Sequence, residues 1–276
     1  MVEIGNTNNL KILRITSHGA YLDGEDLGEI LLPKKFLTSE IKIGDSVDVF
    51  LYFDSEDKLI ATLLKPYTEI NHFARLECVS VTKIGAFLSW GLDKDLLVPK
   101  SEQKDKFFVG KKYTVYVYLD DVSNRIVASN RLSRFLSMTS PEYSEGDKCE
   151  IFVSEKSPIG YKVIVDNLYW GMIYDSELYR EVTLGEYTYG FVKKVRQDNK
   201  IDVMLEKSSV KLVDKTEQEI YERIKEYGGF LKLSDKSSPE EIEKEFHVSK
   251  KVFKKAIGGL YKSRLIEITQ NGLKIV

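Results

Sequence analysis

Cysteine and histidine are scarce in this chain of 276 residues, which holds two cysteines and three histidines. Cys78 and Cys149 are too few and too far apart for a disulfide framework or a CxxC zinc site. His18, His72 and His247 stand alone, with no second ligand at metal-binding spacing. The sequence therefore predicts two reduced, buried thiols and no metal site.

The sequence also lacks the motifs that carry common catalytic and cofactor chemistry. It contains no GxxxxGK[ST], no GxGxxG after a strand, no HExxH and no GxSxG. Carboxylate pairs such as Asp93 with Asp95 and Asp120 with Asp121 lie in expected turns, where acidic residues are ordinary turn formers. We therefore expect no enzymatic activity and no cofactor.

Long apolar runs are missing as well, and residues 1–15 have no unbroken apolar core. Nothing in the sequence resembles a signal peptide or a membrane-spanning helix. With 42% apolar and 30% charged residues, the composition is that of a soluble globular protein. We expect a cytoplasmic protein without a membrane partner. The oligomeric state is open, and a monomer is assumed.

What the sequence does contain is a fixed internal spacing that occurs three times. It is found at Gly19, Pro33, Gly44 and Ile60, at Gly85, Pro99, Gly110 and Ile126, and at Gly160, Tyr174, Gly185 and Ile201. Self-similarity of this kind indicates a repeated module. We predict one module in each of 1–65, 66–140 (which ends in a linker) and 141–210, and a different domain in 211–276. The net charges of these four segments are −4, +3, −4 and +3, so the second and fourth are basic.

Each repeat contains short runs with a period of two. In 46–51 valine and leucine alternate with other residues, as a half-buried strand requires, and a turn follows at 54–58. Five such strands with glycine or aspartate turns, and without a long helix, predict a small closed barrel. The fold class is therefore mainly β.

The last segment changes to a helical period. A helix is expected over 216–229, and Ser238, Pro239 and Glu241 form the start signature of a second helix at 239–246. A third helix follows from residue 250, and an Asn271–Gly272 turn joins two short strands. This order predicts an α+β winged helix-turn-helix domain.

The third helix carries the strongest binding signal. Its lysines, Lys251, Lys254, Lys255 and Lys262, lie opposite its apolar face, and no acidic residue occurs from His247 to Arg264. A merely solvated face would mix charges of both signs, so we favour contact with nucleic acid. That face has no Asn, Gln or Arg to read base edges, and lysine alone suits phosphates.

Two weaker sets of candidates lie in the barrels. A basic run holds Lys193, Lys194, Arg196 and Lys200, which can follow a phosphate backbone or simply form a solubilising outer strand. Phe87 lies on the strand face opposite Ala86 and Leu88, so its ring either stacks a base or packs against a neighbouring module. For Tyr21 and Tyr174 two interpretations stay open: each ring either stacks a base or lies at the barrel edge without a ligand.

The second segment resembles an S1 RNA-binding domain, a five-stranded barrel of the OB type, at its Gly-Ala-Phe motif, Pro-x-Ser-Glu and Asp-x-x-x-x-Arg-Ile. Three such modules followed by LSDKSSPEEIEKEFHVSKKVFKKAIGGLYKSRLIEI resemble the conserved virulence factor B family over nearly the whole chain. The resemblance implies tandem S1-like barrels plus a winged helix, RNA binding and a role in gene expression and virulence regulation. It also implies that Tyr21 and Phe87 are stacking aromatics, a place that Lys162 takes in the third copy, and that Asp120 and Arg125 are a binding pair.

We therefore expect a non-catalytic protein that binds single-stranded RNA through its barrels and its basic winged helix, in post-transcriptional or other regulation. Three alternatives stay open. The chain could be a DNA-binding transcriptional regulator that uses the winged helix, an accessory subunit of an RNA-processing enzyme, or a scaffold whose aromatic faces bind proteins.

Overall fold

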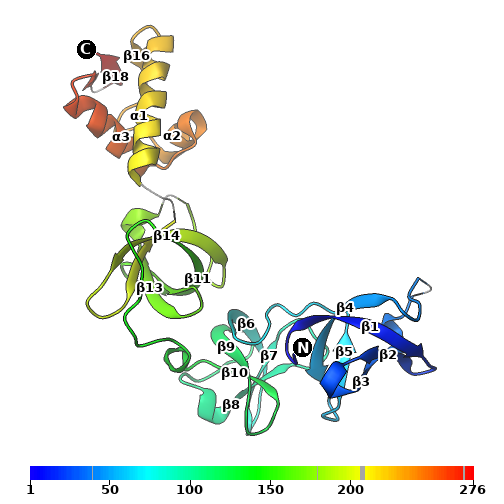
Figure 1. Ribbon diagram of the computed structural model, residues 1–276. Helices are drawn as coiled ribbons and strands as arrows, with labels where there is room; N and C mark the ends of the chain where they lie inside the picture. The colour runs from blue at the N-terminus through cyan, green and yellow to red at the C-terminus, as the bar shows by residue number, and fades with distance from the viewer. Residues whose placement is uncertain (39, 179, 206–208, 270) are drawn as a thin grey trace. The chain divides into compact units, whose positions relative to one another are not determined.

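The computed structural model describes residues 1–38, 40–178, 180–205, 209–269 and 271–276, with side chains left undescribed over 209–215. These residues form three closed barrels and a small helical domain with a three-stranded sheet (Figure 1). The expected fold class is confirmed. The chain divides into two compact units, Met1–Ser137 and Met138–Val276, and each is described by itself.

The first unit contains two barrels of identical topology. The strands of the first are β1 (Thr7–Ile15), β2 (Gly19–Asp23), β3 (Glu29–Pro33), β4 (Ser46–Phe53) and β5 (Leu59–Thr62). Those of the second are β6 (His72–Val81), β7 (Gly85–Ser89), β8 (Leu96–Pro99), β9 (Lys112–Leu119) and β10 (Ile126–Ser129). Each barrel closes by pairing its third strand with its fifth, in parallel, and its first with its fourth.

The recurring spacing in the sequence marks the joints of these barrels. Gly19 lies opposite Pro33 in the β2–β3 ladder, and Gly85 lies opposite Pro99 in β7–β8. A Cβ atom on Gly85 would lie 2.2 Å from the carbonyl oxygen of Val98, so only glycine allows this close approach of the two strands. The spacing therefore recurs because the geometry of each barrel requires it.

Each barrel also has a β-bulge at the same place in its first strand. Register shifts between Ile12 and Arg14 in β1 and between Cys78 and Ser80 in β6. A bulge adds a residue to one strand and bends it, which helps a small barrel to close.

Aromatic side chains join the first barrel to the second. Phe50 and Tyr52 of β4 belong to the buried core cluster of the second barrel, although Phe50 lies on the strand face expected to point outward. The Phe50 and Trp90 ring centroids are 5.7 Å apart in an edge-to-face arrangement. Phe50 is 2% exposed because the second barrel covers it.

The second unit begins with the third barrel. Its strands are β11 (Lys148–Ser157), β12 (Gly160–Val165), β13 (Tyr169–Tyr174), β14 (Tyr187–Val195) and β15 (Ile201–Met204), in the same order as in the other two. Gly160 again lies opposite the next marker of the spacing, Tyr174. Its Cβ would meet the carbonyl oxygen of Ile173 at 2.0 Å.

The C-terminal domain has the winged helix-turn-helix order that the sequence predicts. Its elements are α1 (Ser209–Glu226), β16 (Phe230–Leu231), α2 (Pro239–Phe246), α3 (Lys250–Lys262), β17 (Ile266–Ile268) and β18 (Leu273–Ile275). The first helix begins at Ser209, seven residues before the expected start at residue 216. Ser238 and Glu241 form the predicted capping box of α2, and His247 ends that helix in the left-handed conformation.

Among the residues the structure describes, no helix combines the length and the apolar character needed to cross a membrane. The described part of the chain also brings no three His, Cys, Asp or Glu side chains together as metal ligands.

Candidate nucleic-acid interface

The predicted aromatic positions follow from the bulges. Beyond its bulge, Ser80 of β6 pairs with Phe87 of β7, and Arg14 of β1 pairs with Tyr21 of β2. The ring of Phe87 is half-buried, whereas its neighbours Ala86 and Leu88 are fully buried in the barrel. Phe87 therefore lies on the outer face of β7, as the alternation predicts.

Tyr21 is already in contact with a cation. The guanidinium carbon of Arg14 lies 3.6 Å from the centroid of the Tyr21 ring. Arg14 also donates hydrogen bonds to Glu29 at 2.6 and 3.0 Å, and these bonds lower the pKa of that carboxyl below its usual value. One face of Tyr21 is thus covered by a side chain that is itself neutralised.

In the third barrel Tyr174 belongs to a polar cluster. Its hydroxyl donates to Asp202 at 3.3 Å. Lys193 pairs with Glu177 at 2.9 Å, and that hydrogen bond is the largest cause of its raised pKa, to which the charge of Asp202 also contributes. Two predicted site residues from separate strands, Tyr174 and Lys193, are therefore both near one carboxylate, that of Asp202.

The rest of the basic run in β14 and its turn is largely paired too. Asp198 binds Arg196 at 3.2 Å and Lys200 at 2.9 Å, and the hydrogen bond from Lys200 lowers the pKa of Asp198. Lys194 is exposed and makes no ion pair with any described residue. The predicted basic strip therefore presents one unpaired cation beside three that carboxylates already neutralise.

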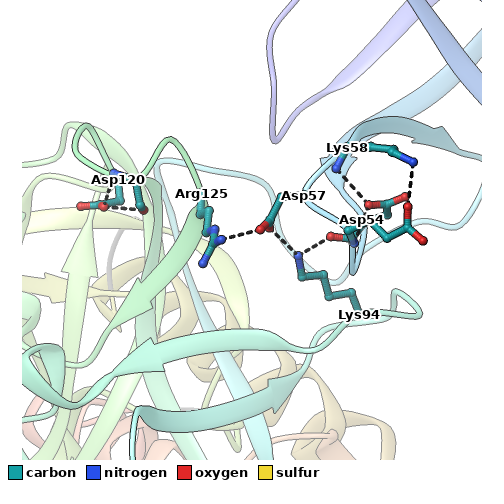
Figure 2. Close-up of polar contacts among 8 residues, drawn as sticks. Asp54, Asp57, Lys58, Lys94, Asp120 and Arg125 are labelled. Carbon is teal, nitrogen blue, oxygen red and sulfur yellow. Dashed lines mark hydrogen bonds and ion pairs between the residues drawn. The ribbon is translucent and has the colours of Figure 1, made fainter.

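Arg125, at the last hairpin of the second barrel, is bound by the first barrel. Figure 2 shows its guanidinium directed at Asp57, which lies in the β4–β5 turn. The Lys94 ammonium, from the β7–β8 turn, lies 3.5 Å from the same carboxylate, and it also donates to the backbone carbonyl of Asp54. Two cations of one barrel thus share one carboxylate of the other.

Asp120, the other residue that the S1 resemblance implies for binding, bonds to Arg125 through the backbone and not through its side chain. The amide of Asp120 donates to the carbonyl of Arg125 at 2.9 Å. The carboxylate of Asp120 instead accepts from the amide and hydroxyl of Ser123, which lowers its pKa (Figure 2). Asp120 therefore shapes the turn, and Arg125 belongs to the inter-barrel contact.

The α3 helix presents its cations differently. Phe253, Ala256, Ile257 and Leu260 are buried on one side. The four predicted lysines, Lys251, Lys254, Lys255 and Lys262, are all exposed on the other. None of them makes an ion pair with any residue that the structure describes.

One more lysine joins this set. Lys250, Lys251, Lys254 and Lys255 line an open hollow on the surface of the helix. Lys250 was missing from the predicted set, although it stands directly after Ser249, which caps the helix by accepting from the amide of Val252. The sequence signal that could have identified Lys250 is its place beside Lys251 at the start of the helix. Closely spaced ammoniums without carboxylates attract the phosphates of a nucleic acid.

The chain matches known domain families over most of its length. An S1 domain model matches residues 4–64 and 72–130, and a CvfB-like winged helix domain model matches 218–275. These ranges contain the first two barrels and the helices α2 and α3. Residues 148–204, the third barrel, lie outside the S1 matches.

Several known proteins are similar to the chain from end to end. The uncharacterized protein YitL of Bacillus subtilis is 30% identical over 94% of this chain and 89% of its own length. The conserved virulence factor B proteins of Staphylococcus saprophyticus and Staphylococcus aureus N315 are 24% and 25% identical over 96% of this chain, and over 92% and 91% of their own lengths. A crystal structure of a multidomain protein with nucleic acid binding domains from Streptococcus pneumoniae TIGR4 is 25% identical over 99% of this chain and 98% of that one, with a TM-score of 0.41.

Proposed function

The chain belongs to the conserved virulence factor B family, and from this premise we propose that it is a non-catalytic, cytoplasmic protein that binds single-stranded RNA. It engages RNA through its S1 barrels and through α3, in the regulation of gene expression. The barrels supply stacking positions at Phe87, Tyr21 and Tyr174. Phosphates are held by Arg125, Lys193, Lys194, Arg196, Lys200, Lys251, Lys254, Lys255 and Lys262.

The observation that carries this proposal is the unpaired lysine face of α3. A phosphate that approaches these ammoniums releases counterions and displaces no carboxylate of the described chain. The face offers charge but no side chain suited to base edges, so its contacts are expected to be independent of sequence.

The barrels add the preference for single strands. A base can stack on an aromatic ring only if it is unpaired, and stacking contributes about 1–3 kcal/mol per base. Phe87 is half-buried on an outer strand face, where a base can reach it. Several weak contacts on one chain act together, because the first contact raises the effective concentration of the next.

A second candidate function has one specific observation in its favour. The α3 helix follows α2 after a short turn capped by Ser249, which is the place of the recognition helix in helix-turn-helix proteins that bind duplex DNA. A DNA-binding regulator would therefore use the same lysine face, with the barrels as partners or sensors.

The test is equilibrium binding of the full chain to three labelled probes: a single-stranded RNA, the single-stranded DNA of the same sequence, and the matching DNA duplex. Fluorescence anisotropy is measured across a salt series. We expect the RNA to bind tightest, with an affinity that falls linearly against salt on logarithmic scales. Tightest binding to the duplex would favour the DNA-binding candidate, and an absence of binding to all three would contradict both. RNA recovered at full length after incubation checks the non-catalytic part.

A further inference from the structure

The loop between β8 and β9 of the second barrel exposes an aromatic ring that the expected S1 site does not include. Phe108 is 47% exposed and Val109 is 63% exposed, whereas the preceding Phe107 is buried. These residues lie within KDKFFVGKK, residues 104–112, which holds four lysines and one aspartate. A large exposed apolar side chain among cations calls for a partner that is both flat and anionic.

The conformation of this loop is fixed by the protein itself. The hydroxyl of Tyr113 accepts from the Phe108 amide at 2.9 Å and donates to the Lys106 carbonyl at 3.2 Å. The Tyr113 ring stacks on Phe107 with centroids 4.0 Å apart. The amide of Gly110, a residue with φ +80°, donates to Cys78 of β6 at 2.8 Å. The backbone that presents Phe108 is therefore ordered before any ligand arrives, which lowers the entropy lost on binding.

Two ammonium groups accompany the exposed ring. The Lys111 nitrogen lies 5.0 Å from the centroid of Phe108, and the Lys106 nitrogen lies 5.4 Å from it. Neither ammonium forms an ion pair with a residue in the described ranges. Both remain available to an anion that arrives with a group stacked on the ring.

The first barrel has the opposite charges at the same positions. The repeat aligns Gly110 with Gly44, and Phe108 therefore with Lys42. The flanking lysines correspond to Glu40 and Asp45 in that barrel. Asp45 there accepts from the Lys42 amide at 2.9 Å, which is the bond that Tyr113 replaces in the second barrel.

The third barrel follows the first. Its equivalent residues are Thr183, with Glu181 and Glu186 at the flanks, and Glu186 accepts from the Thr183 amide at 2.9 Å. A barrel of this topology thus needs neither the aromatic ring nor the lysines. In the second barrel the neutral hydroxyl of Tyr113 accepts the equivalent amide hydrogen bond. The position that holds a carboxylate in the other barrels can therefore hold Lys111 without loss of that bond.

We propose that Phe108, Lys106 and Lys111 form a further binding site for single-stranded nucleic acid, in which one base stacks on Phe108 and the two ammoniums hold the adjoining phosphates. This inference rests on the proposed RNA-binding function. The stacked ring provides a contact that tolerates any base, and the lysines provide the charge neutralisation that a polyanion requires.

The site extends the expected surface of the second barrel. Gly110 bonds to Cys78 on one side of β6, and Ser80 pairs with Phe87 on the other side. The two flanking backbones are therefore about two strand spacings apart, ~10 Å. A short single strand that contacts Phe87 can reach the Phe108 loop on the same barrel.

A lipid surface is the less favoured partner. Binding to a membrane surface scales with the apolar area that enters it. In residues 104–112 only Phe108 and Val109 are exposed large apolar side chains, which is a small area for a membrane contact.

The test compares two substitutions in the full chain. Phe108→Thr introduces the residue that the third barrel carries, and Phe108→Tyr keeps a ring for stacking. Binding of a labelled oligouridylate is measured by anisotropy, with thermal unfolding as the check on folding. We expect Phe108→Thr to weaken binding about fivefold or more, the loss of one stacked base, and Phe108→Tyr to bind within about twofold of the parent chain.

Two further readouts separate the outcomes. Photo-crosslinking with 5-iodouridine RNA, followed by peptide mass mapping, should identify Phe108. If the parent chain binds no single-stranded RNA, the proposed function and this site both fail. If the parent binds RNA and Phe108→Thr binds equally well, this site alone is overturned. Phosphatidylglycerol-containing vesicles form the last arm: loss of vesicle binding with unchanged RNA affinity in Phe108→Thr would overturn the site in favour of a membrane contact.

Discussion

Most of the cations predicted for the barrel sites are paired with carboxylates, whereas the lysines of α3 are not. In the barrels, Arg125 is held by Asp57, and Lys193 by Glu177. On α3, the four lysines that line the hollow, and Lys262 in the last turn, have no carboxylate of the described residues within ion-pair distance. An exposed ion pair contributes only about 0–1 kcal/mol, so a phosphate can displace the carboxylate, but part of its own attraction is offset. A count of basic residues therefore overestimates how strongly a barrel binds phosphate, because carboxylates offset many of its cations. The same count is a fair guide for α3.

The largest effect should therefore come from α3. Replacing Lys251, Lys254 and Lys255 together by Gln removes three unpaired charges. We expect the affinity for single-stranded RNA at low salt to fall about tenfold or more, and the slope of log affinity against log salt to fall by about 2. Anisotropy titrations across a salt series measure both quantities.

A matched control uses exposed lysines of the same domain. Lys232, Lys236 and Lys244 lie outside α3, and their replacement by Gln changes the net charge equally. This control should alter affinity by less than about threefold. Equal losses in the two triple variants would mean that the overall charge of the domain, rather than the α3 face, attracts RNA.

A smaller effect, of opposite sign, should come from the contact between the barrels. Asp57→Asn leaves Arg125 and Lys94 without their shared carboxylate. We expect RNA to bind about two- to fivefold more tightly at low salt, with the gain lost at high salt because exposed charges are then screened. The control is Asp121→Asn, an exposed carboxylate of the β9–β10 turn. The same gain from Asp121→Asn would show that net charge alone is responsible.

The barrels could be predicted from the sequence because their geometry restricts single residues. Gly85 and Gly160 lie where a Cβ would strike a carbonyl oxygen, so the spacing to the opposite strand recurs in every copy. The helix start at Ser238 was equally predictable, because a capping box is a local exchange of hydrogen bonds. The two-residue strand β16 was missed because it is too short to show a period.

Contacts between modules could not be predicted in the same way. Nothing in the alternation of β4 distinguishes Phe50, which the second barrel buries, from an ordinary outward residue. The partner of Arg125 stands 68 positions earlier in the chain, so neither spacing nor composition records the contact. Phe108 had a signal that requires alignment of the repeats: its position holds Lys42 and Thr183 in the other copies. The orientation of Phe87 was predictable, because alternation along a strand fixes it.

The smallest effect is expected from the basic run of the third barrel. Lys193 is bound to Glu177, and Arg196 is bound to Asp198, which Lys200 also binds. Replacing Lys193 and Arg196 by Gln therefore removes two cations whose attraction for phosphate these ion pairs had already reduced. We expect a loss of affinity below about threefold, with a salt slope that changes by less than 1, in the same anisotropy series. Lys194→Gln, which removes the unpaired neighbour, should have an effect comparable to that of the pair although it removes half the charge. A loss from the double variant as large as that from the α3 triple variant would contradict the comparison, because it would mean that carboxylate partners do not reduce what a lysine contributes to RNA binding.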